Sequence, residues 1–561
     1  MWLAWLASLA FLPLLTSAST WHGFWYDLGI FGAHPTLDYK SFDIKAPEIN
    51  IAHWDSRCED GYVLLSPRGH FYPEPGPLIY DHLGNLIWIE RKYGMVMDLN
   101  VQRYKGQDYL TFWVGVDDGT RGEGSYYMLD SSYEIAHIVS AANGLKGDVH
   151  EFKITDQGTA LMSIYEICQM DLTPVGKAAD GWVYDGLFQE IDIETGELLF
   201  EWRARDHYAV NESFMDVGEK GTAPTAADAY DYFHINSIEK KSDGTYLVSS
   251  RYMYSITCIS PTGEILWILG GKRNMFKDLS GGSATDFTWQ HDARWYSDNV
   301  ITLLDNGANE HTRTSDHSRG MMIELDFENM TATAIRIYDS PGHFSSHSQG
   351  NLQVLPKTGN VFIGWGKPSA YTEFTLDGEL LCDTHYGPSM FYWFGWVKSY
   401  RAQKVHWVGK PSYPPDIAVD EAKRTVYVSW NGATEIAGWV LQRALLPHAP
   451  DSEFRTIDYF PKTGFETQFS FSKDTTGYLR VAAVNGKGEE LGYTRVFEGN
   501  SGQIVSPSLL PPSTLEDRSI QEFLLAACVM AAIILVMWKS KSSLPSLYFR
   551  MRWWVRRRFH V

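Results

Sequence analysis

Five histidines recur ahead of short apolar runs, and their spacing is the feature of the chain that most suggests chemistry. They are His53, His150, His234, His291 and His347. His234 and His291 are 57 residues apart, and His291 and His347 are 56 apart. Imidazole titrates near neutral pH and serves as nucleophile, general acid or base, or metal ligand. Histidines at one position of a repeated unit are expected to gather around one axis.

The repeated unit consists of short strand-like runs, and six copies lie between residues 45 and 390. In each copy the polar position precedes an apolar strand such as TYLVSS or ITLLDN, and Gln102 replaces histidine in one copy. Each copy ends in a hairpin such as DIETGELLFEW. Repeats of this size and all-β character predict a six-bladed β-propeller, in which the first strand of each blade lines a central channel. A β-sandwich is the alternative.

The pattern changes after the repeats. Residues 19–410 are assigned to the propeller, and residues 411–498 to a β-sandwich module that resembles fibronectin type III. The second assignment rests on the alternating Val426, Val428 and Trp430 and on the stretch AAVNGKGE. Residues 499–519 are rich in Ser and Pro, which is typical of a flexible stalk.

The two ends of the chain predict a membrane protein of the secretory pathway. Residues 1–18 have the apolar core and small terminal residues of a signal peptide. Residues 520–538 include a charge-free run, Phe523 to Trp538, which is predicted to form one transmembrane helix, although it is short. The tail, 539–561, carries seven Lys and Arg and no acid. This predicts a single-pass type I protein whose large ectodomain is lumenal or extracellular.

The rest of the chain is acidic. The net charge is −20, and without the basic tail it is about −27. This excludes nucleic acid and anionic lipid surfaces as partners, so an anionic substrate would need a local positive site. Sequons at Asn211 and Asn329 are candidate glycosylation sites. Four cysteines in the predicted ectodomain allow three disulfide pairings: Cys58, Cys168, Cys258 and Cys382.

Six segments, in order, resemble the arylsulfotransferase family (ASST) in the form found in fungal secretory proteins. They are VHEFKITDQGTAL, DYFHINSIEKKSDGTYLVSSR, GEILWILGG, QHDARW with LLDNG, SRGMMIELD, and SQGNLQVLPKTGNVFIGWG. The resemblance covers residues 140 to 390 most clearly. It implies a six-bladed propeller that moves a sulfuryl group from one phenol to another through a transiently sulfated histidine. It implies no nucleotide sulfate donor, no catalytic metal and no other cofactor.

The resemblance also implies roles for particular residues. His234 in FHINS and His291 in QHDAR lie in matching motifs, and Arg319 in HSRG matches the arginine that binds sulfate oxygens. His347 in SSHSQGN holds the blade position of the nucleophile, and His343 is the alternative. One of the first two histidines would then protonate the departing phenolate and deprotonate the acceptor.

Other residues near these motifs are candidates on strand geometry. Asn236 lies two residues after His234, so it would share that strand face and add a hydrogen bond. Asp292 would point to the opposite face and be structural. His150 occupies the repeated position and is a candidate substrate contact, whereas Arg251 in VSSR, the rival of Arg319, is expected to brace blades.

Two functions from different classes remain open on the sequence. One is a PAPS-independent aryl sulfotransferase that uses a small aryl sulfate donor and a phenolic acceptor. The other is a non-catalytic, membrane-tethered propeller that binds or organises partners in the secretory pathway. A zinc site formed by several histidines is the disfavoured alternative, because the family resemblance implies no catalytic metal.

Overall fold

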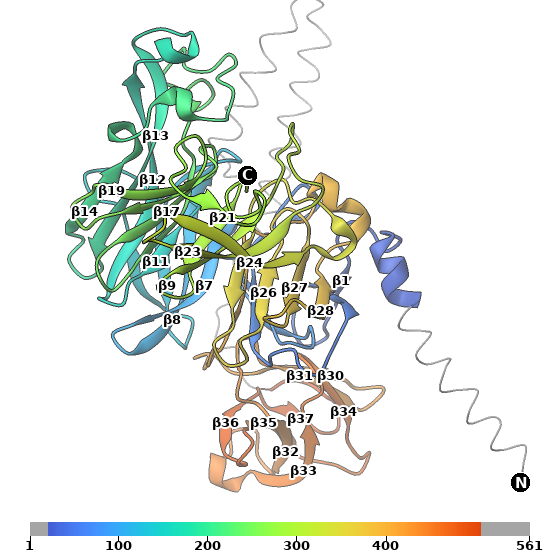
Figure 1. Cartoon of the computed structure of the whole chain (residues 1–561). Coiled ribbons are helices and arrows are strands. Elements are labelled where there is room, and N and C mark those ends of the chain that lie inside the picture. The colour runs from blue at the N-terminus through green and yellow to red at the C-terminus, as the bar shows by residue number, and fades with distance from the viewer. Residues whose placement is uncertain (1–20, 506–561) are drawn as a thin grey trace, which may run out of the picture. The chain divides into compact units, whose positions relative to one another are not determined.

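The computed structural model describes residues 21–505 (Figure 1). The predicted signal peptide, transmembrane helix, basic tail and most of the stalk lie outside these residues. Within 21–505 no helix combines the length and apolar character needed to cross a membrane. The described part is all-β in class, as the sequence predicts.

Six sheets are built from residues 50–405, and four of them each come from one continuous stretch of chain. Their strands pair antiparallel, apart from one short parallel strand in each of two sheets. The first contains β7 (Val96–Tyr104), β8 (Gln107–Asp117), β9 (Gly122–Leu129) and β10 (Ile135–Val139). The second contains β11 (Phe152–Ile154), β12 (Thr159–Met170), β13 (Gly181–Asp192) and β14 (Leu198–Arg203), with β15 (Tyr230–Asp231) beside β13. The third contains β16 (Ile235–Lys240), β17 (Tyr246–Ser250), β18 (Ser255–Ile259) and β19 (Ile265–Gly270). The fourth contains β21 (His291–Trp295), β22 (Val300–Asp305), β23 (Arg319–Asp326) and β24 (Thr331–Asp339), with β20 (Lys277–Asp278) beside β24.

The last two sheets combine strands from both ends of this region. The fifth contains β25 (Asn351–Val354), β26 (Val361–Gly364), β27 (Ala370–Phe374) and β28 (Leu380–His385), with β3 (Asn50–His53) added at its outer edge. The sixth contains β29 (Ala402–Val405), β4 (Tyr62–Leu65), β5 (Leu78–Tyr80) and β6 (Leu86–Ile89). A disulfide between Cys58 and Cys382 ties the segment after β3 to β28. Cys168 and Cys258 are free thiols.

The strand that carries His53 does not lie where the repeat pattern places it. His53 is exposed on β3, at the outer edge of the fifth sheet. The inner position of the sixth sheet is filled instead by β29, which lies beyond the repeats recognised in the sequence. The pairing of chain ends is non-local, so a pattern read along the chain does not reveal it.

The first strands of the six sheets, which we call the inner strands, are β7, β11, β16, β21, β25 and β29. Contacts run from each sheet to the next through these strands or their neighbours, and β29 contacts β7, so the series closes on itself. Apolar clusters fill the spaces between sheets; one joins Leu247 and Leu269 to Leu303 and Met321. The arrangement is propeller-like.

Residues 416–498 form two further sheets, coloured orange to red in Figure 1. One contains β30 (Asp416–Asp420), β31 (Thr425–Ser429) and β34 (Thr467–Ser470). The other contains β33 (Arg455–Pro461), β32 (Gly438–Ala444), β35 (Tyr478–Val484) and β36 (Glu490–Tyr493), with β37 (Phe497–Glu498) beside β35. Val426 and Val428 are fully buried between them with Trp439, as expected for alternating residues on an inward strand face.

Candidate functional site

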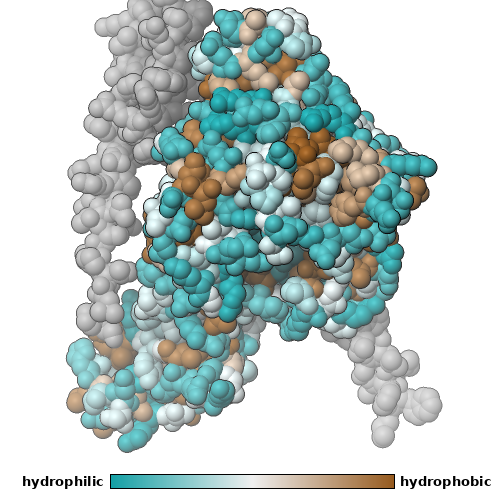
Figure 2. Space-filling view, turned by 60° about the vertical axis from the view of Figure 1, so that its left-hand side comes forward, coloured by the Kyte–Doolittle hydropathy of each residue, from teal (hydrophilic) through white to brown (hydrophobic). Residues whose placement is uncertain are grey.

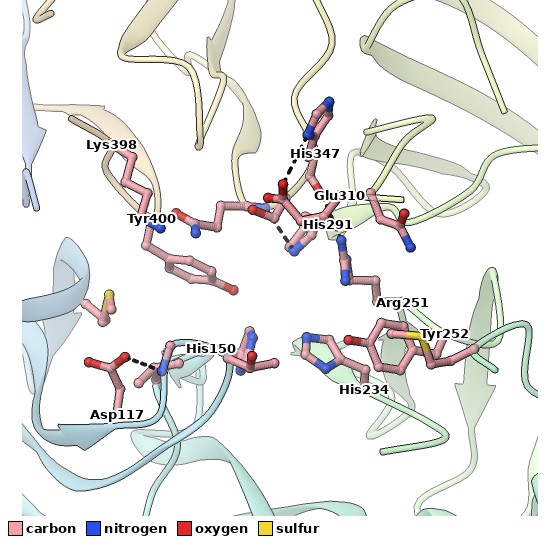
Figure 3. Close-up of a pocket in the computed structure, with 18 of the residues that line it drawn as sticks. Asp117, His150, His234, Arg251, Tyr252, His291, Glu310, His347, Lys398 and Tyr400 are labelled. Atoms are coloured by element: carbon pink, nitrogen blue, oxygen red, sulfur yellow. Dashed lines mark hydrogen bonds and ion pairs between the residues drawn. The ribbon is translucent and has the colours of Figure 1, made fainter. Parts of the chain in front are cut away.

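A pocket of about 330 Å³ lies where the inner strands begin (Figure 3). Four of the recurring histidines line it, together with cationic, acidic and aromatic side chains. The lining includes His150, His234, His291, His347, Arg68, Arg251, Lys398, Asp117, Glu310, Tyr252 and Tyr400. Its size is within the range of small-molecule sites.

Local distortion of the inner strands directs several of these side chains. β7, β16 and β21 each begin with a shift in pairing register. Asp98 and Asp292 lie within two of these shifts, and His234 directly precedes β16; their φ values are 53°, 57° and 56°. Non-glycine residues rarely occupy this region, and such irregularities re-aim side chains at functional sites. For His234, a hydrogen bond from the Arg251 amide to its carbonyl helps to hold the bend.

His150 and His234 form a pair, with ring centroids 4.9 Å apart. Nδ1 of His150 lies 2.5 Å from Asp148 Oδ2, and Nδ1 of His234 lies 2.7 Å from Asp231 Oδ2. Asp231 also accepts a hydrogen bond from Arg121 Nη1 at 2.7 Å. A carboxylate at Nδ1 holds the proton there, which leaves the Nε2 lone pair available.

Burial has the largest effect on His234 and lowers its pKa to about 4, against the opposing influence of Asp231. The imidazole is therefore neutral near pH 7. The charge of Asp231 is secure, because His234 and Arg121 outweigh its burial and lower its pKa to about 2. The result is a neutral, oriented imidazole, which is the state that a nitrogen nucleophile requires.

His291 lines the same pocket, but both of its nitrogens are engaged. Nδ1 lies 2.7 Å from Asn306 Oδ1, and Nε2 accepts the backbone N–H of Gln349 at 3.1 Å. Burial, followed by the charge of Arg251, holds its pKa well below the usual range. In this geometry His291 is neutral and anchors the segment before β25.

The structure separates the two histidines predicted from SSHSQGN. His347 lines the pocket, with Nδ1 3.7 Å from Glu310 Oε2 and 3.5 Å from Lys367 Nζ. His343 is exposed, lies outside the pocket lining and packs against His317 with ring centroids 4.5 Å apart.

Arg251, and not Arg319, places its guanidinium in the pocket beside the histidines. Arg251 is 7% exposed and donates from Nη2 to the His347 carbonyl at 2.8 Å. Within residues 21–505 it forms no ion pair, and its Nε has no hydrogen-bond partner. Arg319, on β23, donates from Nε to Asp305 Oδ2 at 3.0 Å and is not part of the lining. Asn236 is also absent from the lining, since its Nδ2 donates to the Gln290 carbonyl at 2.7 Å.

Several lining residues are not identified from the sequence, among them Arg68, Lys398 and Tyr400. Tyr400 occupies the position before β29 that His150 occupies before β11, so the repeat itself holds the signal. The sequence does not reveal Tyr400 as part of this pattern, because β29 follows the six repeats that end at residue 390. Arg68 and Lys398 carry no comparable pattern.

A buried network of charges lies next to the pocket. Arg401 Nη1 is 2.5 Å from Asp98 Oδ1, and its Nη2 is 3.2 Å from Glu151 Oε2 and 3.4 Å from Asp292 Oδ1. Arg294 Nη2 is 2.5 Å from Glu151 and 2.7 Å from Asp292. Three of these residues line a second cavity of about 540 Å³ that shares no lining residue with the pocket, so the network separates the two spaces: Glu151, Asp292 and Arg294.

A model of the arylsulfotransferase family, described as Arylsulfotransferase (ASST), matches residues 100–387. The chain belongs to the arylsulfotransferase family. Membership supports an aryl sulfotransferase-like function, with an aryl sulfate donor and a phenolic acceptor in general terms. The matched segment contains the four recurring histidines of the pocket, while Arg68, Lys398 and Tyr400 lie outside it.

Solved structures give more distant likenesses to this arylsulfotransferase-family chain. A protein of unknown function from Bacteroides caccae has 12% identity and a TM-score of 0.36, over 61% of this chain and 98% of that chain. The Dos1 propeller has 11% identity and a TM-score of 0.28, over 63% and 72%. A streptogramin B lyase has 7% identity and a TM-score of 0.27, over 72% and 90%. No curated protein matches the chain.

The described part of this arylsulfotransferase-family chain contains no group of three or more His, Cys, Asp or Glu arranged to hold a metal ion. The pocket histidines instead take carboxylate, amide and backbone partners at Nδ1 or Nε2. The polar groups that remain available in the pocket include the Nε2 atoms of His150 and His234 and the guanidinium of Arg251.

Proposed function

We propose that this pocket moves a sulfuryl group between phenolic compounds, with His234 as the nucleophile and His150 as the general acid and base. The observation that carries the proposal is the pair of carboxylate-held imidazoles beside a buried, unpaired guanidinium. Such a site offers a nucleophile, a proton donor and a donor fork for sulfate oxygens within one pocket.

The transfer would take two steps. In the first, Nε2 of His234 attacks the sulfur of an aryl sulfate, so an N–S bond forms as the S–O bond to the aryl group breaks. The leaving phenolate takes the Nε2 proton of a His150 imidazolium. In the second, His150 removes the proton of an acceptor phenol, whose oxygen attacks sulfur and frees His234. Each proton and sulfuryl group is accounted for, and the kinetics are ping-pong.

Arg251 would bind the sulfuryl oxygens. Charge spreads onto the peripheral oxygens during sulfuryl transfer, as it does in phosphoryl transfer, so a preorganised cation near the sulfur lowers the barrier. The unpartnered Nε of Arg251 supports this role. The ion pair of Arg319 with Asp305 favours a structural role for that residue.

His234 is preferred to His347 as the nucleophile because of the group at Nδ1. His234 has a carboxylate at 2.7 Å, whereas the nearest carboxylate oxygen to His347 Nδ1 is 3.7 Å away and an ammonium is 3.5 Å away. An ammonium donating to Nδ1 would place the proton on Nε2 and remove the attacking lone pair.

The test follows nitrophenolate release from 4-nitrophenyl sulfate by the full chain in detergent, with phenol as acceptor. The variants are His234→Asn, His150→Asn and His347→Asn. In a second experiment the protein reacts with the donor alone, and the reaction is quenched before hydrolysis. Mass spectrometry of the sulfated peptide should then locate the sulfuryl group on His234. A label on His347 would move the nucleophile there. No turnover across a panel of aryl sulfates and phenols would favour the non-catalytic binding protein.

We also infer the finer architecture: a six-bladed propeller, a fibronectin type III-like module, and a single-pass type I anchor that holds the ectodomain in the secretory pathway. The closed series of six sheets and the two sheets of residues 416–498, with three and five strands, support the two domains. The Cys58–Cys382 disulfide and the exposed Asn211 and Asn329 are compatible with an oxidising, glycosylating compartment. Protease treatment of intact microsomes should remove only the basic tail; digestion of the propeller would contradict this topology.

A further inference from the structure

Two cationic side chains, Arg68 and Lys398, lie opposite each other in the pocket wall. The two residues form an isolated antiparallel bridge that extends the pairing of β4 with β29. The amide of Arg68 donates to the Lys398 carbonyl at 2.8 Å, and the amide of Lys398 donates to the Arg68 carbonyl at 2.9 Å. Residues paired in this way project their side chains from the same face, and like charges directly opposite each other are destabilising.

Neither cation has a direct carboxylate partner among the described residues. Arg68 is 9% exposed, and its Nε has no hydrogen-bond partner within residues 21–505. Across residues 21–505, neither side chain forms an ion pair or a hydrogen bond. Two acids also line the pocket. Asp117 accepts the Gly119 amide at 2.7 Å, and Glu310 pairs with Lys367 at 2.6 Å. Asp117 offsets part of the effect of burial on the pKa of both cations, and Glu310 does so for Lys398, but the pKa of each stays lowered.

The electrostatic cost of this pair is visible in both groups. Burial, followed by the charge of Arg68 and then that of Lys367, lowers the pKa of Lys398 to about 8. Burial also lowers the pKa of Arg68. A buried cation without a partner is costly, and such costs are retained where a ligand supplies the counter-charge.

The pair is separate from the guanidinium assigned to the sulfuryl group. In Figure 3, Lys398 and Tyr400 lie on one side of the pocket, and Arg251 lies with Tyr252 and His234 on the other. The pocket therefore offers two cationic points with aromatic rings and imidazoles between them. A ligand that satisfies both must carry negative charge at two ends.

We propose that Arg68 and Lys398 bind a carboxylate on the acceptor, so that the preferred acceptors are phenols with a carboxylate remote from the hydroxyl. This inference rests on the proposed function, since it assigns the Arg251 side to the sulfuryl group. Two charge-assisted contacts select the acceptor, while the Tyr400 ring is placed to pack against its aromatic body.

The experiment measures acceptor binding by calorimetry on the full chain, without any sulfate donor. 4-Hydroxybenzoate is compared with its neutral isostere 4-hydroxybenzamide, and 4-hydroxycinnamate with its amide, because the second pair spans a longer distance. For at least one pair, the carboxylate should bind about tenfold or more tightly than the amide, as charge-assisted hydrogen bonds predict. Equal affinity within both pairs would overturn the proposal.

Variants locate the effect. Arg68→Gln and Lys398→Gln should each weaken carboxylate binding by about tenfold and leave amide binding unchanged. Arg68→Lys, which keeps the charge, should retain most of the preference. Lys487→Gln, which removes an exposed charge in the sandwich, is the matched control and should change neither. Thermal melting without ligand checks folding, and loss of one like charge should leave Tm unchanged or raise it.

The outcomes separate this inference from the proposed function. Carboxylate binding that depends on Arg68, without sulfuryl transfer to any acceptor, would keep the anion site and remove the transferase. Transfer to phenol, 4-hydroxybenzamide and 4-hydroxybenzoate with the same KM in wild type and Arg68→Gln would keep the transferase and remove the anion site.

Discussion

The inner strands carry two groups of charged side chains: those that line the pocket, and those of the buried ion network around Arg401 and Arg294. The cations of the network have carboxylate partners, whereas within residues 21–505 those of the pocket do not. Adjacent residues alternate between them: His150 faces the pocket and Glu151 the ion network, as do Tyr400 and Arg401 on another strand. In the network, two guanidinium groups are surrounded by three carboxylates, each within 3.4 Å of an arginine nitrogen. In the pocket, three lining cations lack ion pairs: Arg68, Arg251 and Lys398.

We infer that the paired charges of the network stabilise the fold, and that the unpaired cations of the pocket bind a ligand. A buried charge is tolerated when the protein satisfies it, and the network does so with its own side chains. The pocket leaves the same kind of charge unsatisfied, in a chain whose net charge is −20. Local positive charge set against an acidic body is what the sequence requires of an anionic substrate site.

Removing a network cation should have the largest effect on stability. Arg401→Met leaves Asp98, Glu151 and Asp292 without their shared partner, and we expect the free energy of unfolding to fall by about 3–5 kcal/mol. Urea titration at pH 7 measures this. The control, Arg103→Met, breaks an exposed pair with Asp108 and should cost about 1 kcal/mol or less. Equal losses in the two variants would mean that the network is not a structural support.

Removing a pocket cation should reverse the pattern. Arg251→Met is expected to lower kcat/KM for sulfuryl transfer by about 10²–10³-fold, the effect of losing one transition-state donor. Stability should change by about 1 kcal/mol or less, since no carboxylate loses a partner. Arg319→Met should do the opposite, because it orphans the buried Asp305 while leaving the pocket lining intact. If Arg319→Met abolishes activity and Arg251→Met retains it, the sulfate-binding role returns to Arg319, as the HSRG motif predicts.

The histidines of the pocket show how much of the site can be predicted from the sequence. His150, His234, His291 and His347 were found from a periodic pattern, because each precedes or begins an inner strand and strand order follows chain order. His53 was misplaced because the sheet it precedes is completed by β29, through pairing between chain ends.

The remaining misses involve side-chain partners. Arg251 and Arg319 were both recognised as candidates, but the choice depends on which of them meets a carboxylate. That is decided by Asp305, which lies across from Arg319 on β22. Arg68 and Lys398 face each other only after β29 joins β4, so their pairing is invisible in the linear chain. The repeat therefore identifies the four recurring histidines that line the pocket, whereas pairing between strands determines which cations beside them have partners.

Acid should lower the stability of the protein, because the buried His234 of the pocket resists protonation. Its pKa is about 4 in the folded protein and near 6.5 in the unfolded chain, so the unfolded state binds more protons between these values. Stability is therefore complete above about pH 6.5 and declines as pH falls toward 4, by about 2–3 kcal/mol from this group. Urea titrations across this range should show a shallower decline in His234→Asn. Asp231 does not obscure the window, since its lowered pKa acts mainly below pH 4.

The smallest expected effect is alkaline and concerns Lys398. In the free protein its ammonium loses its proton near pH 8, because of burial and of the charges of Arg68 and Lys367, against the opposing influence of Glu310 and Asp117. Affinity for 4-hydroxybenzoate should fall by about three- to tenfold as pH rises through 8, while Arg68 maintains the residual binding. The ratio of the affinity for 4-hydroxybenzoate to the affinity for 4-hydroxybenzamide is the informative quantity, because ionisation of the phenol affects both ligands. In Lys398→Gln the ratio should be low and independent of pH. If the wild-type ratio stays constant from pH 7 to pH 9, the carboxylate does not contact Lys398 and the anion site reduces to Arg68 alone.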